Sequence, residues 1–154
     1  MHILLPTDGS DIALDAARRG LGVLDAPTQI TLLSVVADLP VDSGAGGFEG
    51  PVYTLEQEEE LRRGQQRNAE HALAATEVVV LATHPGASID RRIEVGDPAA
   101  AICLIAGRLG VDVVVVGSHG KGFLSRVLLG SVSEHVTRHA PCPVLVVRTA
   151  PETK

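Results

Sequence analysis

Two small clusters of glycine and serine have the composition and spacing of a phosphate-binding site. The first, Gly117-Ser118-His119-Gly120, follows a run of four valines, and after nine further residues comes Gly130-Ser131. A glycine backbone adopts positive φ and approaches a ligand closely, because it has no Cβ. If Gly130 precedes a helix, the free N–H groups of the first turn attract phosphate, and the hydroxyls of Ser131 and Ser133 add donors.

Two other phosphate loops are excluded by the residues that surround these clusters. A Walker A loop requires Ser or Thr after Gly-Lys, but Gly120-Lys121 is followed by Gly122. A dinucleotide fingerprint would follow the first strand, where Pro6-Thr7-Asp8-Gly9-Ser10 contains a single glycine. The spaced glycine–serine clusters therefore remain as the phosphate-binding hypothesis.

Asp8 is the acidic residue best placed to join this site. It follows the first predicted strand, and parallel sheets bind ligands at the carboxyl ends of their strands. The alternative is a local role, as the cap of the following helix or the start of an Asx-turn. Further along, Lys121 and Arg126 either attract phosphate or solvate their loop. His119 is interpreted as a solvent-exposed spacer rather than a base.

No residue of the sequence is predicted to be catalytic. Nothing near the clusters has the character of a poised base, nucleophile or water-activating group. His135 and His139 share a helix face at i,i+4 and could bind a metal ion, but no third ligand lies nearby in the sequence. Cys103, on an apolar helix, is interpreted as a core residue, and Cys142, between two prolines, as a small residue at a strand entry.

The elements that position these residues alternate along the chain. Short apolar runs predict strands over residues 2–6, 29–36, 88–95, 111–116 and 144–147. Helical spacing predicts helices after Ser10, after a loop of residues 38–52, after Asp97 and over residues 131–139, with Ser10 and Asp97 as N-caps. The valine-rich run 78–81 is ambiguous and is assigned to the end of the second helix.

This alternation predicts an α/β fold. It corresponds to a single open, mostly parallel, five-stranded sheet with helices on both faces, a Rossmann-like arrangement. The strands are nearly continuous Val, Ile and Leu, as expected for strands buried on both sides. Acidic and basic residues crowd positions 56–67 of the second helix, and we interpret them as a solvated helix face rather than a docking surface.

Composition excludes several classes of function. The 154 residues carry 13 Lys+Arg against 19 Asp+Glu, a net charge of −6, with one Tyr, two Phe and no Trp, which argues against a nucleic-acid binder. No apolar run approaches the roughly 18 residues of a membrane span, and two cysteines are too few for a disulfide framework. We expect one domain over residues 1–150, with a tail at 151–154, in a soluble, cytoplasmic protein.

Segments spread over the whole chain carry a resemblance to one family. They are Pro6-Thr7-Asp8-Gly9-Ser10, Val95-Gly96-Asp97-Pro98, Gly117-Ser118-His119-Gly120, Gly130-Ser131-Val132 and the closing run from Pro141 to Val147. With them the chain resembles the universal stress protein family, in particular its ATP-binding branch. The resemblance implies the strand order 3-2-1-4-5, which reverses between the first and fourth strands. Asp8 and the loop at Gly117 would then meet where such sheets bind ligands.

The resemblance also implies a role for each site residue. Asp8 would contact ribose or a phosphate-bound Mg²⁺, and Pro6, Thr7 and Val35 would line an adenine pocket. The rest of the nucleotide would be held by the end of the fourth strand and by the glycine–serine clusters: Val116, Gly117, Gly120, Gly130, Ser131, Val132 and Ser133. Ser34 replaces a histidine that is common in the family before Val35.

The function expected from this resemblance is that of a regulatory module of stress tolerance that binds ATP, with Mg²⁺ on its phosphates. The alternatives are a slow ATPase or autophosphorylating phosphotransferase, and a cyclic-AMP-binding or nucleotide-free interaction protein of the same fold. The last strand, Val144-Leu145-Val146-Val147, has no charge or proline that would protect a sheet edge. With the resemblance, it predicts a homodimer through this strand, and no nucleic-acid or membrane partner.

Overall fold

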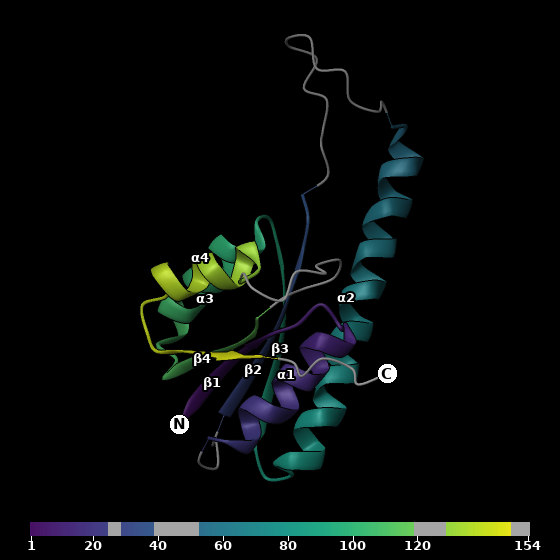
Figure 1. The fold of residues 1–154 in the computed structure, drawn as a ribbon. Helices are drawn as coiled ribbons and strands as arrows, with labels where there is room; N and C mark the ends of the chain where they lie inside the picture. Colours follow the sequence, from purple (N-terminus) through teal and green to yellow (C-terminus); the bar gives the residue numbers. More distant parts are fainter. Residues whose placement is uncertain (25–28, 39–52, 119–128, 149–154) are drawn as a thin grey trace, which may run out of the picture.

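The computed structural model describes residues 1–24, 29–38, 53–118 and 129–148. It contains a parallel five-stranded sheet in the order β3-β2-β1-β4-β5, so the predicted fold class and strand order are confirmed (Figure 1). Along the chain the elements are β1 (His2–Pro6), α1 (Asp11–Gly22), β2 (Gln29–Val36), α2 (Leu55–Thr83), β3 (Ser88–Val95), α3 (Pro98–Leu109), β4 (Val113–Gly117), α4 (Ser131–His139) and β5 (Val144–Val147). The strand order reverses between β1 and β4.

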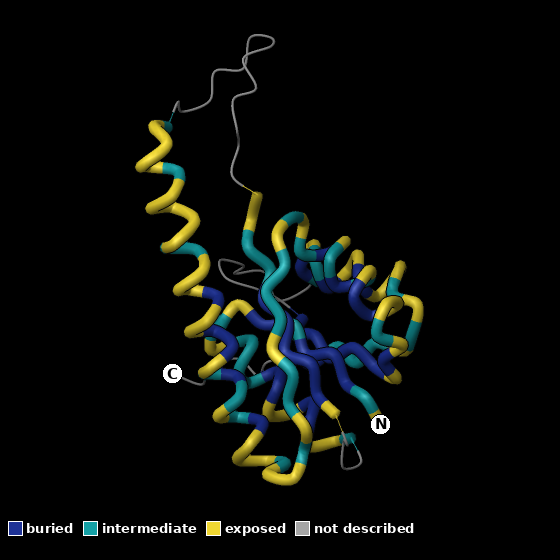
Figure 2. Tube along the Cα trace, turned by 180° about the vertical axis from the view of Figure 1, so that it is seen from behind, coloured by how far each residue is buried: buried dark blue, intermediate teal, exposed yellow. Residues whose placement is uncertain are grey.

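Two helices cover each face of the sheet. α1 and α2 pack on one face, and α3 and α4 pack on the other (Figure 1). Successive strand residues point to opposite faces, so Ile3 and Leu5 pack beneath α1 and α2, whereas Leu4 packs beneath α3 and α4. Because both faces are covered, the three inner strands are almost wholly buried (Figure 2), which explains their continuous aliphatic sequences.

β3 departs from the aliphatic pattern expected of the strands. It lies at an edge of the sheet, and its residues are half-buried or exposed. Arg91 forms an ion pair with Glu77 of α2, and Arg92 Nε lies 2.9 Å from Asp90 Oδ2. The expectation of continuous burial is wrong for this strand, because an edge faces water and charged side chains there discourage pairing with another chain.

Two element boundaries depend on local geometry that an apolar pattern does not show. The run 78–81 is helical, as assigned, and its burial follows the helical period: Val80 is fully buried, while Val78 and Leu81 are exposed. The fourth strand begins at Val113, two residues later than predicted. The reason is that the N–H of Val111 donates to the Ala106 carbonyl and closes the end of α3.

Three of the four helices in the described ranges begin with a capping side chain. Ser10 caps α1 and Asp97 caps α3, as predicted, each by accepting a hydrogen bond from the backbone N–H three residues on, at 3.2 and 2.8 Å. Thr54 caps α2 in the same way. α4 follows Gly130, which makes no side-chain hydrogen bond. The first N–H groups of α4 therefore depend on other acceptors.

The first half of α2 extends beyond the sheet. None of residues 55–68 is buried, whereas the second half packs on β2 and β3 (Figure 2). Glu59 and Arg63 form an exposed ion pair of 2.9 Å, in line with the interpretation as a solvated face. Although α2 has 29 residues it is too polar for a bilayer, and no other described helix is long and apolar enough to cross one.

Gly20 leaves no room for a side chain between α1 and β4. A Cβ at this position would lie 2.4 Å from Val115 Cγ1 and 3.2 Å from Val147 Cγ2. We expect Gly20→Ala to push the helix off the sheet and lower the free energy of unfolding by about 1–3 kcal/mol.

Gly22→Ala is the matched control in the same helix, because a Cβ there meets nothing within 4 Å. It should be neutral or raise the free energy of unfolding by up to about 1 kcal/mol, since alanine favours helix. Urea unfolding measures both variants. Equal stability of the two would contradict the close approach of α1 to β4.

Candidate functional site

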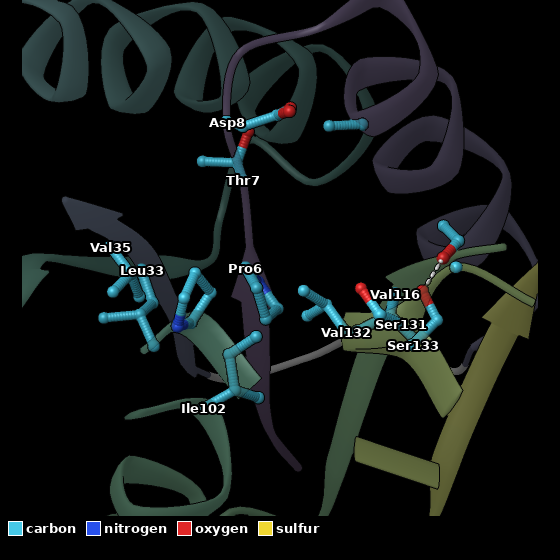
Figure 3. A pocket seen from close by; sticks show the side chains of 14 residues that line it. Pro6, Thr7, Asp8, Leu33, Val35, Ile102, Val116, Ser131, Val132 and Ser133 are labelled. Carbon is cyan, nitrogen blue, oxygen red and sulfur yellow. Dashed lines mark hydrogen bonds between the residues drawn. The ribbon is translucent and has the colours of Figure 1, made fainter. Parts of the chain in front are cut away.

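A pocket opens at the carboxyl ends of β1 and β4, where the strand order reverses (Figure 3). Its volume is about 360 Å³, within the range of small-molecule sites. β1, β2 and β4 contribute to its lining, as do the first turns of α1, α3 and α4. The lining residues are Pro6, Thr7, Asp8, Ala13, Leu33, Val35, Pro98, Ile102, Val116, Gly117, Gly130, Ser131, Val132 and Ser133.

Ten of the eleven residues predicted to bind a nucleotide line this pocket. They are Pro6, Thr7, Asp8, Val35, Val116, Gly117, Gly130, Ser131, Val132 and Ser133. The eleventh, Gly120, lies outside the described residues, as do His119, Lys121 and Arg126. The structure brings the predicted residues together, while their roles toward a ligand stay predictions.

The sequence does not indicate four of the lining residues: Ala13, Leu33, Pro98 and Ile102. Leu33 lies two residues before Val35 on the same face of β2, so the strand period could have pointed to it. Ala13, Pro98 and Ile102 come from the early turns of α1 and α3. Which side of such a turn faces the pocket depends on how the helix packs, and no local signal carries that information.

Asp8 both lines the pocket and shapes the turn after β1. Its Oδ1 accepts hydrogen bonds from Ser10 N at 3.0 Å and from Ser10 Oγ at 2.6 Å. This is the Asx-turn that stood as the alternative to ligand binding. Gly9 completes the turn with a φ of 71°, which glycine adopts without steric cost. The two roles are compatible, because the turn holds the carboxylate at the pocket (Figure 3).

Thr7 ties the pocket to α2 through a buried chain of hydroxyls. Its Oγ1 lies 2.7 Å from Thr76 Oγ1, and Thr76 Oγ1 donates to the Ala72 carbonyl at 2.8 Å. Because the Thr76 hydroxyl donates its one hydrogen to that carbonyl, Thr7 is the donor in the bond between the two hydroxyls. The oxygen of Thr7 also accepts a hydrogen bond from Gly9 N at 3.1 Å. The one hydroxyl hydrogen of Thr7 is therefore committed to α2 and not to a ligand.

Ser133 joins α4 to the end of β4. Its Oγ donates to the Gly117 carbonyl at 2.5 Å (dashed in Figure 3), and the residue is only 6% exposed. The hydroxyl hydrogen of Ser133 is thus used within the protein. Of the two serines expected to donate to phosphate, the exposed Ser131 is therefore the one that a ligand can reach.

The uncapped N-terminus of α4 lies at the pocket. Gly130 and the first three residues of α4 are all in the lining. The N–H of Gly130 donates to the Ser118 carbonyl at 2.8 Å, which fixes the entry of the chain into the helix. The first-turn N–H groups lie at the positive end of the helix dipole, and together they form a place for an anion.

Comparison with known proteins gives the family of the chain. Residues 1–148 match the sequence model of the universal stress protein family. The universal stress protein MJ0531 of Methanocaldococcus jannaschii is 35% identical over 148 residues, which are 95% of this chain and 81% of that protein. The chain belongs to the universal stress protein family.

Solved structures share the fold of this universal stress protein. The hypothetical protein MJ0577 matches with a TM-score of 0.75 at 31% identity, over 98% of this chain and 97% of that chain. A family protein from Arabidopsis thaliana with AMP bound gives 0.66 at 20% identity, over 99% and 94% of the two chains. A universal stress protein in complex with cAMP gives 0.62 at 22%, over 97% and 98%. The last two likenesses concern the fold alone.

Ser34, the position at which the resemblance implies a histidine, does not line the pocket. Ser34 is 4% exposed and pairs in register with Ile93 of β3. Its neighbours Leu33 and Val35 line the pocket, and the alternation of a strand directs Ser34 to the opposite face. A histidine at this position would lie on the sheet face beneath α1 and α2, not in the lining.

The lining offers little acid–base or nucleophilic chemistry. Asp8 is the one titratable side chain among the described lining residues. Cys103 and Cys142 pack instead against the core beneath α3 and α4, and burial raises the pKa of both thiols. Protonated thiols are weak nucleophiles, so the raised pKa lowers the reactivity of both cysteines at neutral pH. Within the described ranges no group of three metal-ligating side chains occurs.

The hydroxyl chain between the pocket and α2 is tested by Thr76→Val, which keeps the shape of the side chain. The variant leaves the buried Thr7 hydroxyl without its acceptor, so the free energy of unfolding should fall by about 1–3 kcal/mol. Thr83→Val is the control, because Thr83 Oγ1 also donates to α2 carbonyls but is exposed. It should change stability by less than about 0.5 kcal/mol. Equal losses in urea unfolding would count against the buried chain.

Proposed function

We propose that this universal stress protein is a regulatory module that binds ATP in the pocket between β1 and β4. The observation that carries the proposal is the N-terminus of α4, which lies at the pocket and whose N-cap Gly130 has no capping side chain, while the other three described helices have one. Free N–H groups at the positive end of a helix are phosphate-binding groups. A nucleotide with its phosphates there would extend its base toward the far end of the pocket.

The far end of the pocket has the surface that a base requires. Leu33, Val35 and Ile102 line it, and Figure 3 shows Leu33 and Val35 across Pro6 from Ser131, with Ile102 below Pro6. A flat aromatic base among such side chains is removed from water. An apolar lining with a few polar groups at one end is typical of cofactor sites. This division supports a nucleotide as the ligand over inorganic phosphate.

Asp8 is proposed to accept a hydrogen bond from a ribose hydroxyl or to contact Mg²⁺ that the phosphates carry. The Asx-turn holds its carboxylate in place before any ligand arrives. Mg²⁺ in nucleotide sites is held by one or two carboxylates together with the phosphates. The described lining has a single carboxylate, so it fits a metal ion that arrives with the nucleotide better than a resident one.

Adenine nucleotides are the ligand class that relatives of this fold suggest. The Arabidopsis structure holds AMP, and another universal stress protein structure is a complex with cAMP. The bare first turn of α4 favours ATP over cAMP, since a chain of free phosphates brings more negative charge to it than a cyclic phosphodiester does. The proposal therefore includes a preference for ATP.

The proposed role is binding rather than turnover. Rapid phosphoryl transfer requires groups that position the nucleophile and neutralise the transition state. Among the described lining residues only Asp8 ionises. A slow ATPase or autophosphorylating enzyme is the rival function, and steady turnover on the order of 1 s⁻¹ would favour it.

Two substitutions of Asp8 distinguish the effect of its negative charge on ATP binding from the effect of the Asx-turn that it forms. Asp8→Asn keeps an oxygen that accepts from Ser10, whereas Asp8→Ala removes both the charge and the turn. We expect Asp8→Ala to weaken ATP binding about tenfold, or ~1.4 kcal/mol, and Asp8→Asn to weaken it less if the partner is a ribose hydroxyl. A contact to Mg²⁺ would instead make the two losses similar and dependent on Mg²⁺.

Calorimetry with ATP and with cAMP, with and without Mg²⁺, measures these affinities. Asp11→Ala is the matched control, because Asp11 is an exposed carboxylate in the first turn of α1 that does not line the pocket. It should bind ATP as the wild type does. An unchanged ATP affinity in Asp8→Ala would remove Asp8 from the site.

The partner proposed for the β5 edge is a second copy of this chain. β5 is the last strand of the sheet, and the carbonyls of Pro143 and Val147 accept hydrogen bonds from Val114 of β4 and from Ser118, which directly follows β4. In a parallel ladder alternate residues turn both backbone groups to the same neighbour. The backbone N–H and C=O groups of Val144 and Val146 therefore point away from β4. Pairing with β5 of a second copy, related by a two-fold axis, would satisfy these groups.

Val146→Pro removes one outward N–H and leaves the ladder with β4 intact. We expect light scattering to give a dimer for the wild type and a monomer for Val146→Pro, because proline cannot donate across the seam. Val146→Ala keeps the N–H and should remain dimeric. A dimer of unchanged mass in Val146→Pro would locate the contact elsewhere.

A further inference from the structure

The histidine pair at the end of α4 takes no part in the nucleotide pocket. His135 and His139 are exposed, lie in the last turns of α4 and do not line the pocket. Their rings stack with centroids 4.1 Å apart and planes inclined by 28°. Side by side on the surface, they present two imidazoles to the same region of solvent.

One of the two rings is held in an orientation that is typical of metal-binding histidines. His139 Nδ1 lies 2.8 Å from the backbone carbonyl oxygen of His135. A carbonyl only accepts, so Nδ1 carries the hydrogen, and Nε2 of the neutral ring keeps its lone pair. Histidines that bind metals characteristically donate their second ring N–H to a carbonyl or carboxylate, which fixes the ring. The His139 ring makes this bond to the carbonyl of His135.

The spacing of the rings suits two bonds to one ion. Zn–N bonds of about 2.0–2.1 Å at the tetrahedral angle place two ligand nitrogens about 3.4 Å apart. In the stacked arrangement the in-plane lone pairs of the two rings run nearly side by side, with centroids 4.1 Å apart. Binding of one ion therefore requires the His135 ring to turn out of the stack toward His139 Nε2, and its exposure leaves room for that turn.

The charges around the pair also accommodate a cation. The pair lies at the C-terminal end of α4, where the helix dipole is negative. Arg138, which shares the last turn, is paired with Glu134 at 2.7 Å, so a carboxylate offsets its charge.

We propose that His135 and His139 form a surface site for a divalent transition-metal ion. Zn²⁺ is the ion that we expect to bind, and water molecules complete its coordination. Imidazole nitrogens suit Zn²⁺ among the common cellular cations. The described residues supply no third ligand, so the site is open and exchangeable rather than structural. The bound ion bridges consecutive turns of α4, the helix whose first turn lines the pocket. The proposal does not depend on nucleotide binding.

The test is a calorimetric titration of the nucleotide-free full chain with Zn²⁺. We expect binding of one equivalent in the wild type. His135→Gln and His139→Gln should each weaken the binding about tenfold or more, because a single imidazole remains. His71→Gln is the matched control, since His71 is an exposed histidine on α2. Its affinity for Zn²⁺ should equal that of the wild type.

Thermal unfolding gives a second readout of the same site. At a Zn²⁺ concentration about 100 times Kd, the midpoint of the wild type should rise by roughly 5–10 °C, and both histidine variants should lose this rise. Absence of binding up to about 1 mM, or equal affinity in the wild type and both variants, overturns the proposal. Asp8→Ala should bind Zn²⁺ normally, which distinguishes this result from a failure of the nucleotide site.

Discussion

The pairing of β1 with β4 is the constraint on which the rest of the structure depends. Ile3 pairs with Val113 and Leu4 with Val114, which makes β1 and β4 neighbours at the centre of the sheet. Right-handed crossovers then require the chain to leave β1 toward one face and β4 toward the other. The two connections diverge, and the pocket lies in the space between them. The strand order thus creates the pocket, and the side chains decide what it can hold.

What a polar group can do for a ligand depends on whether the protein already uses it. Thr7 and Ser133 both line the pocket, yet each spends its hydroxyl hydrogen inside the fold, on Thr76 and on the Gly117 carbonyl. The first turn of α4 is in the opposite situation, because Gly130 has no side chain with which to satisfy it. The chemistry of the site therefore follows from the groups left over after folding, and residue type alone does not identify them.

The parts of this fold that sequence predicts are those that local physics determines. Ser10 and Asp97 cap helices through bonds three residues long, and the aliphatic strands result from burial on both faces. Thr7 and Thr76 are 69 residues apart, so no local pattern shows that they meet. The side of α3 that faces the pocket at Ile102 and the exposure of β3 likewise depend on packing. For this reason Ile102 was not predicted as a lining residue, and the burial of β3 was predicted wrongly.

The two walls of the pocket are supported by different kinds of contact. On the α1 and α2 side, the hydroxyl chain from Thr7 and the approach of Gly9 to Ala72, where a Cβ would meet backbone at 2.9 Å, leave little freedom to move. On the α3 and α4 side, apolar side chains such as Ile102 and Val132 form the lining, and one hydrogen bond from Ser133 ties α4 to β4. The first wall is therefore held by directional bonds and backbone contact, whereas the second depends on the close packing of side chains.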